Sequence, residues 1–477
     1  MKKDNPGSKA NRNILRLTYV ISALFLCLCA YFAWFLQVRS ESVINNSYNN
    51  ARMDSFADRI VRGKILSNDG SVLAETVTDE NGTERRSYPY GPLFSHAVGY
   101  STKGKTGLES QANFYLWRSH VNLMEQTVNE LTGVKNPGDS VVTTLDVRLQ
   151  QTASDALGDR RGAVVVMEPD TGKILAMVSK PSFDPNTLEE NWDSLISPEN
   201  TSAQLLNRAA QGLYPPGSTF KIVTALEYIR EHPGDFQDYH FDCNGSFHLD
   251  NYTIKCYHET AHGSQDLGLA FANSCNGAFA NLGLGLDLGK LNSLTGELLF
   301  GKDLPLPFAY NKSSFTMNNG ADTWTVLQTS IGQGETQITP IHNLLLTAAI
   351  ANGGTLMKPY LIDSVENAGG EEIKKFMPSS YGSLMSAGEA QTLTNLMRGV
   401  VTDGTGSAVR TDAYTVAGKT GSAEFETGKE THAWFVGFAP AETPKIAVSV
   451  IVEEGGSGGK VAGPVARSIF DAYFMNN

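Results

Sequence analysis

The longest apolar run in the chain lies near its N-terminus. Residues 17–38 contain no charged side chain and are rich in Leu, Ala, Phe and Cys. A helix of about 20 apolar residues crosses the hydrocarbon of a bilayer, and Tyr31, Trp34 and Phe35 gather at the end where an interfacial aromatic belt lies. The pattern predicts a transmembrane helix over 17–38. A cleaved signal peptide is the alternative, but the run is too long for one and no Ala-x-Ala site follows it.

The charges on either side of this run predict an orientation. Of the net charge of −12, residues 1–16 contribute +4 and the remaining residues −16. Basic segments stay on the cytoplasmic side of a membrane. We therefore expect a cytoplasmic tail at 1–16, a single-pass anchor, and everything beyond residue 38 outside the cytoplasm.

Downstream of the anchor, segments whose apolar residues follow a strand pattern alternate with segments whose apolar residues follow a helix pattern. Apolar runs that flank Asp-Gly or Asp-Thr-Gly turns predict paired strands, and apolar residues at spacings of three and four predict helices. The expected strands are 62–66, 72–74, 163–167, 174–178, 414–424, 433–439 and 445–453, and the expected helices are 124–131, 218–231, 270–282 with a turn around 274–276, 340–351 and 465–474. The last three strands follow one another as a meander.

Length and charge limit the protein class. A chain of 477 residues with 41% hydrophobic and 18% charged residues can form two or more packed domains. We place a first extracytoplasmic module, a pedestal, at 39–155 and a second module at 156–477. The net negative charge argues against nucleic acid as a partner, because a phosphate backbone requires a basic face.

Candidate chemistry begins at residues 214–221, Tyr-Pro-Pro-Gly-Ser-Thr-Phe-Lys, where a predicted helix starts. Ser218 and Lys221 are three residues apart and therefore share one face of that helix. A partly buried lysine with a lowered pKa can take the serine proton and so activate the hydroxyl as a nucleophile. The positive end of the helix favours the developing oxyanion.

A Ser-x-x-Lys pattern alone is a weak signal. It recurs at Ser457 to Lys460, in a glycine-rich stretch for which we predict no helix behind the serine. Only one choice of motifs places a serine at a helix start, Ser274-x-Asn276 between two helices, and Lys-Thr-Gly-Ser at 419–422 on the first strand of a meander. Order and context together therefore favour this set over chance.

In this order the three motifs resemble those of penicillin-binding proteins and serine β-lactamases. In the role that this resemblance implies, Ser274 passes a proton between Lys221 and the leaving nitrogen of the substrate. The amide of Asn276 holds the substrate backbone.

The third motif has the matching role of binding the end of a peptide. Lys419 supplies positive charge for a carboxylate, and Thr420 adds a hydroxyl. Gly421 leaves room for an extended substrate to lie beside the strand. The backbone amides of Ser218 and Ser422 form the expected oxyanion hole.

The resemblance covers nearly the whole chain and points to the class B penicillin-binding proteins, in particular the elongation-type penicillin-binding protein 2 (PbpA-like) family. Its further motifs are Arg62–Ile65, Thr144–Asp146, Tyr214–Gly217, Gly332–Glu335, Asp403–Gly406 and Ala433–Gly437. The resemblance implies an α+β transpeptidase fold, in which helices cover an antiparallel sheet, set on a small N-terminal pedestal.

The same resemblance implies a reaction and a location. Ser218 attacks the penultimate D-Ala carbonyl of a peptidoglycan stem, releases D-Ala, and passes the acyl group to an amine of a neighbouring stem in cell-wall synthesis. β-Lactams acylate the same serine, and catalysis requires no cofactor. The short pedestal has no room for a glycosyltransferase domain, so polymerisation falls to a partner, by resemblance a SEDS-family membrane polymerase. The protein is expected in the bacterial cell membrane with its catalytic domain extracytoplasmic.

Two other classes share this acylation chemistry. A membrane-anchored β-lactamase needs a base that activates water for deacylation, and we assign none from the sequence. A β-lactam sensor needs a cytoplasmic signalling domain, and only residues 1–16 precede the predicted anchor.

The cysteines leave two alternatives. Two of the five lie in the predicted membrane helix, and Cys243, Cys256 and Cys275 lie outside it. Either Cys243 pairs with Cys256 in a disulfide, which leaves Cys275 as a buried thiol, or all three join His262 in a tetrahedral structural zinc site. Spacing does not decide between the two.

Overall fold

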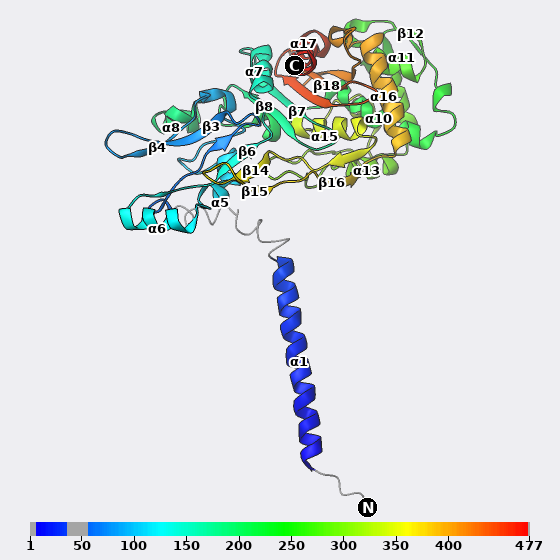
Figure 1. The fold of residues 1–477 in the computed structure, drawn as a ribbon. Coiled ribbons are helices and arrows are strands. Elements are labelled where there is room, and N and C mark those ends of the chain that lie inside the picture. Colours follow the sequence, from blue (N-terminus) through cyan, green and yellow to red (C-terminus); the bar gives the residue numbers. More distant parts are fainter. Residues whose placement is uncertain (1–5, 36–55, 476–477) are drawn as a thin grey trace, which may run out of the picture.

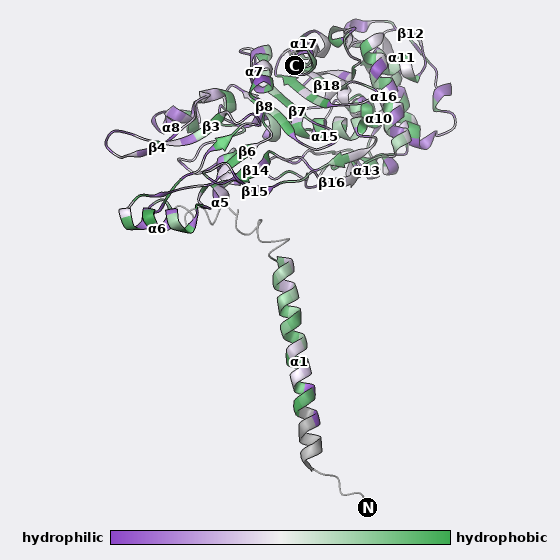
Figure 2. Cartoon of the chain, in the orientation of Figure 1, coloured by the Kyte–Doolittle hydropathy of each residue, from purple (hydrophilic) through white to green (hydrophobic). Residues whose placement is uncertain are grey.

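The computed structural model describes residues 6–35 and 56–475 (Figure 1). Helix α1 spans Pro6–Trp34, and its part from Ile14 to Trp34 is long and apolar enough to cross a membrane. The apolar side chains of this part are exposed, and Figure 2 shows the change from a polar start to an apolar remainder. Residues 36–38 of the predicted span lie outside the described residues.

The pedestal is built on a six-stranded sheet with the order β15-β14-β6-β2-β3-β4. The strands are β2 (Ile65–Leu66), β3 (Val72–Thr78), β4 (Glu84–Ser87), β6 (Ser140–Thr143), β14 (Ile362–Glu366) and β15 (Glu372–Lys375). The predicted strand pair around the Asp-Gly turn is confirmed, because Ile65 faces Ala74 in an antiparallel pair. Strand β14 pairs with β6, so a segment from late in the chain returns to complete the sheet.

Smaller elements surround this sheet. They are β1 (Ile60–Val61), β5 (Asn136–Pro137), η4 (Gly91–Phe94), α4 (Gly107–Gln111), α5 (Asn113–Leu116) and α6 (Leu123–Thr132), the last of which was predicted. The Arg62 guanidinium forms a 2.6 Å ion pair with the carboxylate of Glu109, and both side chains are buried. This pair joins the first strands of the pedestal to α4.

The second module contains a five-stranded antiparallel sheet with the order β17-β18-β19-β7-β8. The strands are β7 (Gly162–Met167), β8 (Ile174–Lys180), β17 (Ala417–Ala423), β18 (His432–Ala439) and β19 (Ile446–Val452). The predicted hairpin and the predicted meander are both confirmed. Every residue of β7 is buried, because side chains that alternate along the strand enter two different cores.

Helices cover both faces of this sheet (Figure 1). Helices α7 (Val147–Leu157) and α17 (Gly463–Phe474) cover one face of the sheet and form a hydrophobic core with it. Helix α15 (Pro340–Ala351), capped by Thr339 as predicted, packs on the other face against β18, β19 and β7. The fold is therefore the expected α+β arrangement of an antiparallel sheet between helices.

The structure contains the following further helices and strands. They are η5 (Pro185–Thr187), α8 (Leu188–Ile196), α9 (Arg208–Gln211), η6 (Gly217–Phe220), α10 (Lys221–Glu231), η7 (Phe236–Asp238), β9 (Phe241–Cys243), β10 (Ser246–Leu249), β11 (Tyr252–Lys255), η8 (Tyr257–Glu259), β12 (Gly263–Gln265), α11 (Leu267–Ala272), α12 (Asn276–Gly285), α13 (Leu288–Glu297), α14 (Thr323–Ser330), β13 (Thr355–Met357), β16 (Ser380–Ser383), α16 (Ala387–Thr402), η9 (Ser407–Val409) and η10 (Gly458–Ala462). Helices α11 and α12 are the predicted pair around residues 274–276.

Candidate active site

Ser218 lies in η6, a 3-10 turn that leads directly into α10, and its side chain is half-buried beside strand β17. Two hydrogen bonds fix the loop before it. Trp434 Nε1 donates to the Pro215 carbonyl at 3.0 Å, and Thr219 Oγ1 donates to the Pro216 carbonyl at 2.7 Å. The candidate nucleophile therefore stands at a helix start on a braced loop, where the helix dipole favours negative charge.

Lys221 is the first residue of α10 and is fully buried. Its Nζ donates to Ser274 O at 2.7 Å, to Ser274 Oγ at 3.2 Å and to Asn276 Oδ1 at 2.7 Å. Burial lowers the pKa of Lys221 to about 7, against a smaller opposing effect of Cys275 and Cys256. A neutral amine, which a general base requires, is therefore available near neutral pH.

Ser274 follows α11 and has a φ of 54°. This left-handed conformation is uncommon for a serine and concentrates at functional sites. The Oγ atom accepts hydrogen bonds from Lys221 Nζ at 3.2 Å and from Lys419 Nζ at 2.9 Å. The Ser274 hydroxyl is thus held between the two amines.

Lys419 lies on β17, the edge strand of the five-stranded sheet, and is fully buried. Burial, together with the charge of Lys221, holds the pKa of Lys419 well below its usual value. Its Nζ atom also lies 5.5 Å from the ring centre of Phe271. Within residues 6–35 and 56–475, no carboxylate forms an ion pair with either lysine. Two buried amines without an acidic partner favour the binding of an anionic group.

The hydroxyls beside Lys419 also have partners. Thr420 Oγ1 lies 2.6 Å from Thr405 Oγ1, and Ser422 Oγ accepts from the Gly458 amide at 3.3 Å. Thr405 belongs to the Asp403–Gly406 motif, to which the sequence assigned no task. The contact indicates that Thr405 orients the Thr420 hydroxyl. No local pattern in the sequence links the two threonines.

Two glycines allow the backbone around Ser218 to pack closely. A Cβ on Gly421 would lie 3.2 Å from both Thr219 Cγ2 and Trp434 Cβ, so this glycine allows β17 to approach the nucleophile loop, a reason distinct from space for substrate. At Gly332, where φ is +84°, a Cβ would lie 1.8 Å from the Gly217 carbonyl oxygen. These contacts explain glycine at both positions without reference to a ligand.

The second Ser-x-x-Lys pattern differs from what the sequence suggested. A helix does follow Ser457, because η10 continues directly into α17. Ser457 Oγ accepts from the Lys460 backbone amide at 3.4 Å, and the Lys460 side chain is exposed. This serine is therefore a helix cap without a buried amine beside it.

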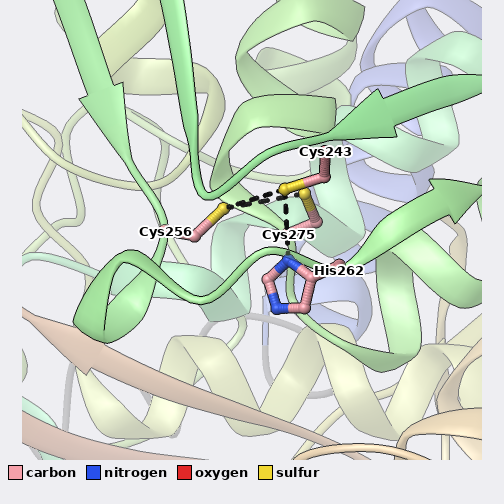
Figure 3. A group of neighbouring side chains, drawn as sticks. All are labelled: Cys243, Cys256, His262 and Cys275. Atoms are coloured by element: carbon pink, nitrogen blue, oxygen red, sulfur yellow. Dashed lines mark hydrogen bonds between the residues drawn. The ribbon is translucent and has the colours of Figure 1, made fainter.

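The side chains of Cys243, Cys256, His262 and Cys275 converge on one point, as Figure 3 shows. Their ligand atoms all lie within 4.8 Å of one another. The Sγ atom of Cys256 lies 3.6 Å from Cys243 Sγ and 3.7 Å from Cys275 Sγ. His262 Nδ1 lies 3.4 Å from Cys243 Sγ. All three cysteines are free thiols.

The four side chains come from separate elements next to the active site. Cys243 ends β9, Cys256 follows β11, His262 precedes β12, and Cys275 is the N-cap of α12. Hydrogen bonding from Cys275 lowers the pKa of the Cys256 thiol. The cluster therefore ties the two hairpins to the start of the helix that carries Asn276.

Comparison with known proteins identifies the family. A family model described as the penicillin binding protein transpeptidase domain matches residues 162–471, and one described as the penicillin binding protein A dimerisation domain matches residues 62–141. The peptidoglycan D,D-transpeptidase PbpA of Mycolicibacterium smegmatis is 33% identical over 97% of this chain and 99% of its own length. The chain belongs to the penicillin-binding transpeptidases.

Solved structures agree with this assignment. The transpeptidase resembles penicillin-binding protein A of M. tuberculosis in an imipenem acyl-enzyme complex, with a TM-score of 0.80 and 30% identity over 88% of this chain and all of that one. It also resembles the D,D-transpeptidase domain of a peptidoglycan glycosyltransferase from Eggerthella lenta, with a TM-score of 0.78 and 34% identity over 87% of this chain and 98% of that one.

The structure thus brings the side chains of Lys221, Ser274, Asn276 and Lys419 of this transpeptidase into one hydrogen-bonded group. Ser218 stands one turn away and, among the described residues, makes no side-chain hydrogen bond to that group. The sequence did not assign tasks to Trp434 and Thr405, although both occur in motifs that carried the resemblance.

Proposed function

We propose that this chain is a peptidoglycan D,D-transpeptidase that works through an acyl-enzyme on Ser218. The observation that carries the proposal is the pair of buried amines, Lys221 and Lys419, joined through Ser274 Oγ and unpaired with any acid among the described residues. Such a site suits a substrate that brings its own carboxylate, as a stem peptide ending in D-Ala does. The similarity to the peptidoglycan D,D-transpeptidase PbpA of Mycolicibacterium smegmatis supports this chemistry.

In the proposed acylation, neutral Lys221 takes the proton of Ser218 Oγ, which attacks the penultimate D-Ala carbonyl. The amides of Ser218 and Ser422 receive the oxyanion. The C–N bond then breaks, and Ser274 passes a proton from Lys221 to the leaving nitrogen. D-Ala departs, and an ester remains on Ser218.

Transfer reverses these proton movements. The amine of a neighbouring stem attacks the ester carbonyl, gives its proton to the Ser274–Lys221 pair, and forms the new amide as Ser218 regains its proton. Asn276 holds the substrate backbone, while Lys419 and Thr420 bind the terminal carboxylate during acylation. No step of this scheme uses a cofactor.

A β-lactamase is the second candidate function, and the site argues against it. Within the described part of the chain, no carboxylate makes a hydrogen bond to Lys221, Ser274, Asn276 or Lys419. Fast hydrolysis of the acyl-enzyme needs a base that activates water. We therefore expect a penicilloyl ester to persist.

We further propose that the cysteine cluster of Cys243, Cys256, His262 and Cys275 holds a structural zinc ion. A tetrahedral zinc with Zn–S bonds of about 2.3 Å separates its sulfur ligands by about 3.7–3.8 Å, and Cys256 Sγ lies 3.6 Å from Cys243 Sγ and 3.7 Å from Cys275 Sγ. A Cys243–Cys256 disulfide needs about 2.05 Å between sulfurs and leaves His262 without a task. The ion would brace the hairpins against Asn276, whose Nδ2 donates to the Lys255 carbonyl at 2.9 Å.

The proposed location is the bacterial cell membrane. The apolar length of α1 supports a single anchor, and the basic residues before it support a cytoplasmic N-terminus. The catalytic module would then face the peptidoglycan. Because neither matched family model describes a glycan polymerase, we propose that a SEDS-family membrane polymerase supplies the strands that this protein cross-links.

The direct test uses a stem peptide ending in D-Ala-D-Ala together with an acceptor amine. The wild-type protein should release the leaving group and form the peptide–amine product, and Ser218→Ala should form none. The Ser457→Ala variant, which changes the second Ser-x-x-Lys pattern, is the matched control and should retain activity. Product formation by Ser218→Ala would reject the assignment.

A further inference from the structure

Helix α6 (Leu123–Thr132) carries an apolar stripe that no other part of the described chain covers. None of its residues is buried. Leu123, Met124 and Leu131 are 81%, 79% and 83% exposed, and Val128 is 56% exposed. At helical spacing these side chains lie on one side of the helix, and Figure 2 shows apolar colour along it.

On the polar side of α6, Asn129 is half-buried and the other residues are exposed. Asn129 Nδ2 donates to Asn136 Oδ1 at 2.9 Å and so ties this side to β5. Glu125 and Gln126 also lie away from the stripe. Helices on the surface of a soluble domain turn their apolar side to the core, whereas α6 leaves its apolar side exposed and contacts the domain through Asn129.

Local hydrogen bonds define α6 without burial. Asn122 Oδ1 accepts from the Glu125 amide at 2.8 Å, and Gly133 ends the helix with a φ of 69°. Thr127 Oγ1 donates to the Leu123 carbonyl at 2.7 Å, so the single hydroxyl on the stripe is already paired. An isolated helix of this length is marginal in water, and a covering environment would stabilise it.

The position of α6 indicates what that environment is. Strand β1 pairs in parallel with β5, and Ile60 faces Asn136. The chain that arrives from α1 therefore joins the pedestal beside the end of α6. Only the residues between Trp34 and Phe56 separate the two parts, and a connection of that length spans at most about 75 Å.

We propose that α6 is an interfacial helix, whose apolar stripe enters the headgroup–acyl boundary of the membrane that holds α1. The inference rests on the membrane anchorage proposed above. The stripe carries no charge, and Glu125 and Glu130 are the ionisable residues of α6. Binding is therefore driven by apolar burial and does not depend on anionic lipid.

A protein partner fits this stripe less well than lipid. Protein–protein interfaces carry about one hydrogen bond per 100–200 Å², and the stripe offers no unpaired polar group because the Thr127 hydroxyl is bonded within the helix. A bare apolar surface of this kind matches hydrocarbon. Insertion of this stripe would hold the pedestal on the membrane surface, at a fixed distance from the catalytic module.

The test uses the full chain in native membranes with a photo-crosslinking residue, p-benzoylphenylalanine, at Leu131. Illumination should add a lipid to the peptide that contains position 131. The matched control places the same residue at Gln126 on the opposite side, where the lipid adduct should be weaker by at least about fivefold. A third probe at Leu24 within α1 tests the anchorage separately.

Each outcome decides the proposal. Lipid at positions 24 and 131 but not at 126 supports it. Lipid at 24 alone, equal lipid at 131 and 126, or a protein crosslink at 131 overturns it, whether the protein is another chain, a second copy or this chain's own residues 36–55. Absence of lipid at 24 rejects the anchorage and the inference together. In the protein that carries the probe at position 131, the further substitution Met124→Glu should reduce the lipid adduct. Penicillin labelling of Ser218 reports whether this variant is folded.

Discussion

Lys221 Nζ lies 2.7 Å from Oδ1 of Asn276, so one side chain joins the nucleophile helix to the second motif. The amide oxygen accepts a hydrogen bond but carries no charge. Burial therefore outweighs the smaller opposing effect of Cys275 and Cys256 and lowers the pKa of Lys221 to about 7. A site with a carboxylate in place of Asn276 would hold the lysine charged and unfit to accept a proton.

The first prediction is a pH profile. The rate of penicillin acylation should rise through a midpoint near pH 7, because protonated Lys221 cannot take the Ser218 proton and the neutral amine predominates above its pKa. Stopped-flow acylation between pH 5 and 9 measures this profile. A rate that falls as pH rises through 7 would contradict Lys221 as the base.

The second prediction concerns Asn276→Asp. An opposite charge close to an amine raises the amine pKa by about 1–3 units, so the acylation midpoint should move up by at least about one unit, with a matching loss of rate at pH 7. Asn276→Gln keeps the amide and should leave the midpoint near the wild-type value. An unchanged midpoint in an active Asp variant would argue that Asn276 does not act on Lys221.

The third prediction concerns Trp434→Phe. The substitution leaves the buried Pro215 carbonyl without its donor, which should cost about 1–3 kcal/mol of unfolding free energy. Acylation should slow by about tenfold or more, because the nucleophile loop is then less well held. Trp324→Phe, at a half-exposed position in α14, is the control for loss of an indole and should show neither effect. Thermal unfolding and labelling kinetics measure both. If Trp434→Phe is acylated at the wild-type rate, Trp434 does not hold the nucleophile loop for acylation.

Much of this site could be predicted from the sequence, and some of it could not. The strand meander, the helix after Ser218 and the turn around Ser274 are local features, and their periodicity and turn residues sufficed to predict them. The contact of Thr405 with Thr420 and that of Trp434 with Pro215 join residues distant in sequence. No local pattern encodes such a contact.

Non-local pairing also explains two other differences. Strands β14 and β15 join the pedestal sheet although they follow the catalytic nucleophile by more than a hundred residues, and only tertiary structure reveals such a return. Helix α17 was predicted, but the turn η10 that joins Ser457 to it was missed, because the glycines around Ser457 suggested a loop. In the structure, η10 is held by packing against β18 and β19.

The fourth prediction concerns the cysteine cluster. Metal analysis of the purified full chain should find about one zinc per molecule, and Cys275→Ser should lose the metal together with thermal stability, because the ligands then no longer close the shell. Cys29→Ser, in the apolar helix α1, is the matched control and should retain both. Metal-free protein whose mass shows one disulfide would reject the zinc site.

The assignment of the acyl-enzyme to Ser218 can be tested by mass spectrometry. The purified full chain is incubated with penicillin G, and intact mass followed by peptide mapping locates and times the adduct. This assignment predicts one penicilloyl group on the peptide that contains Ser218, which persists for hours and is absent from Ser218→Ala. An adduct on another residue, or one that is hydrolysed within seconds, would contradict it.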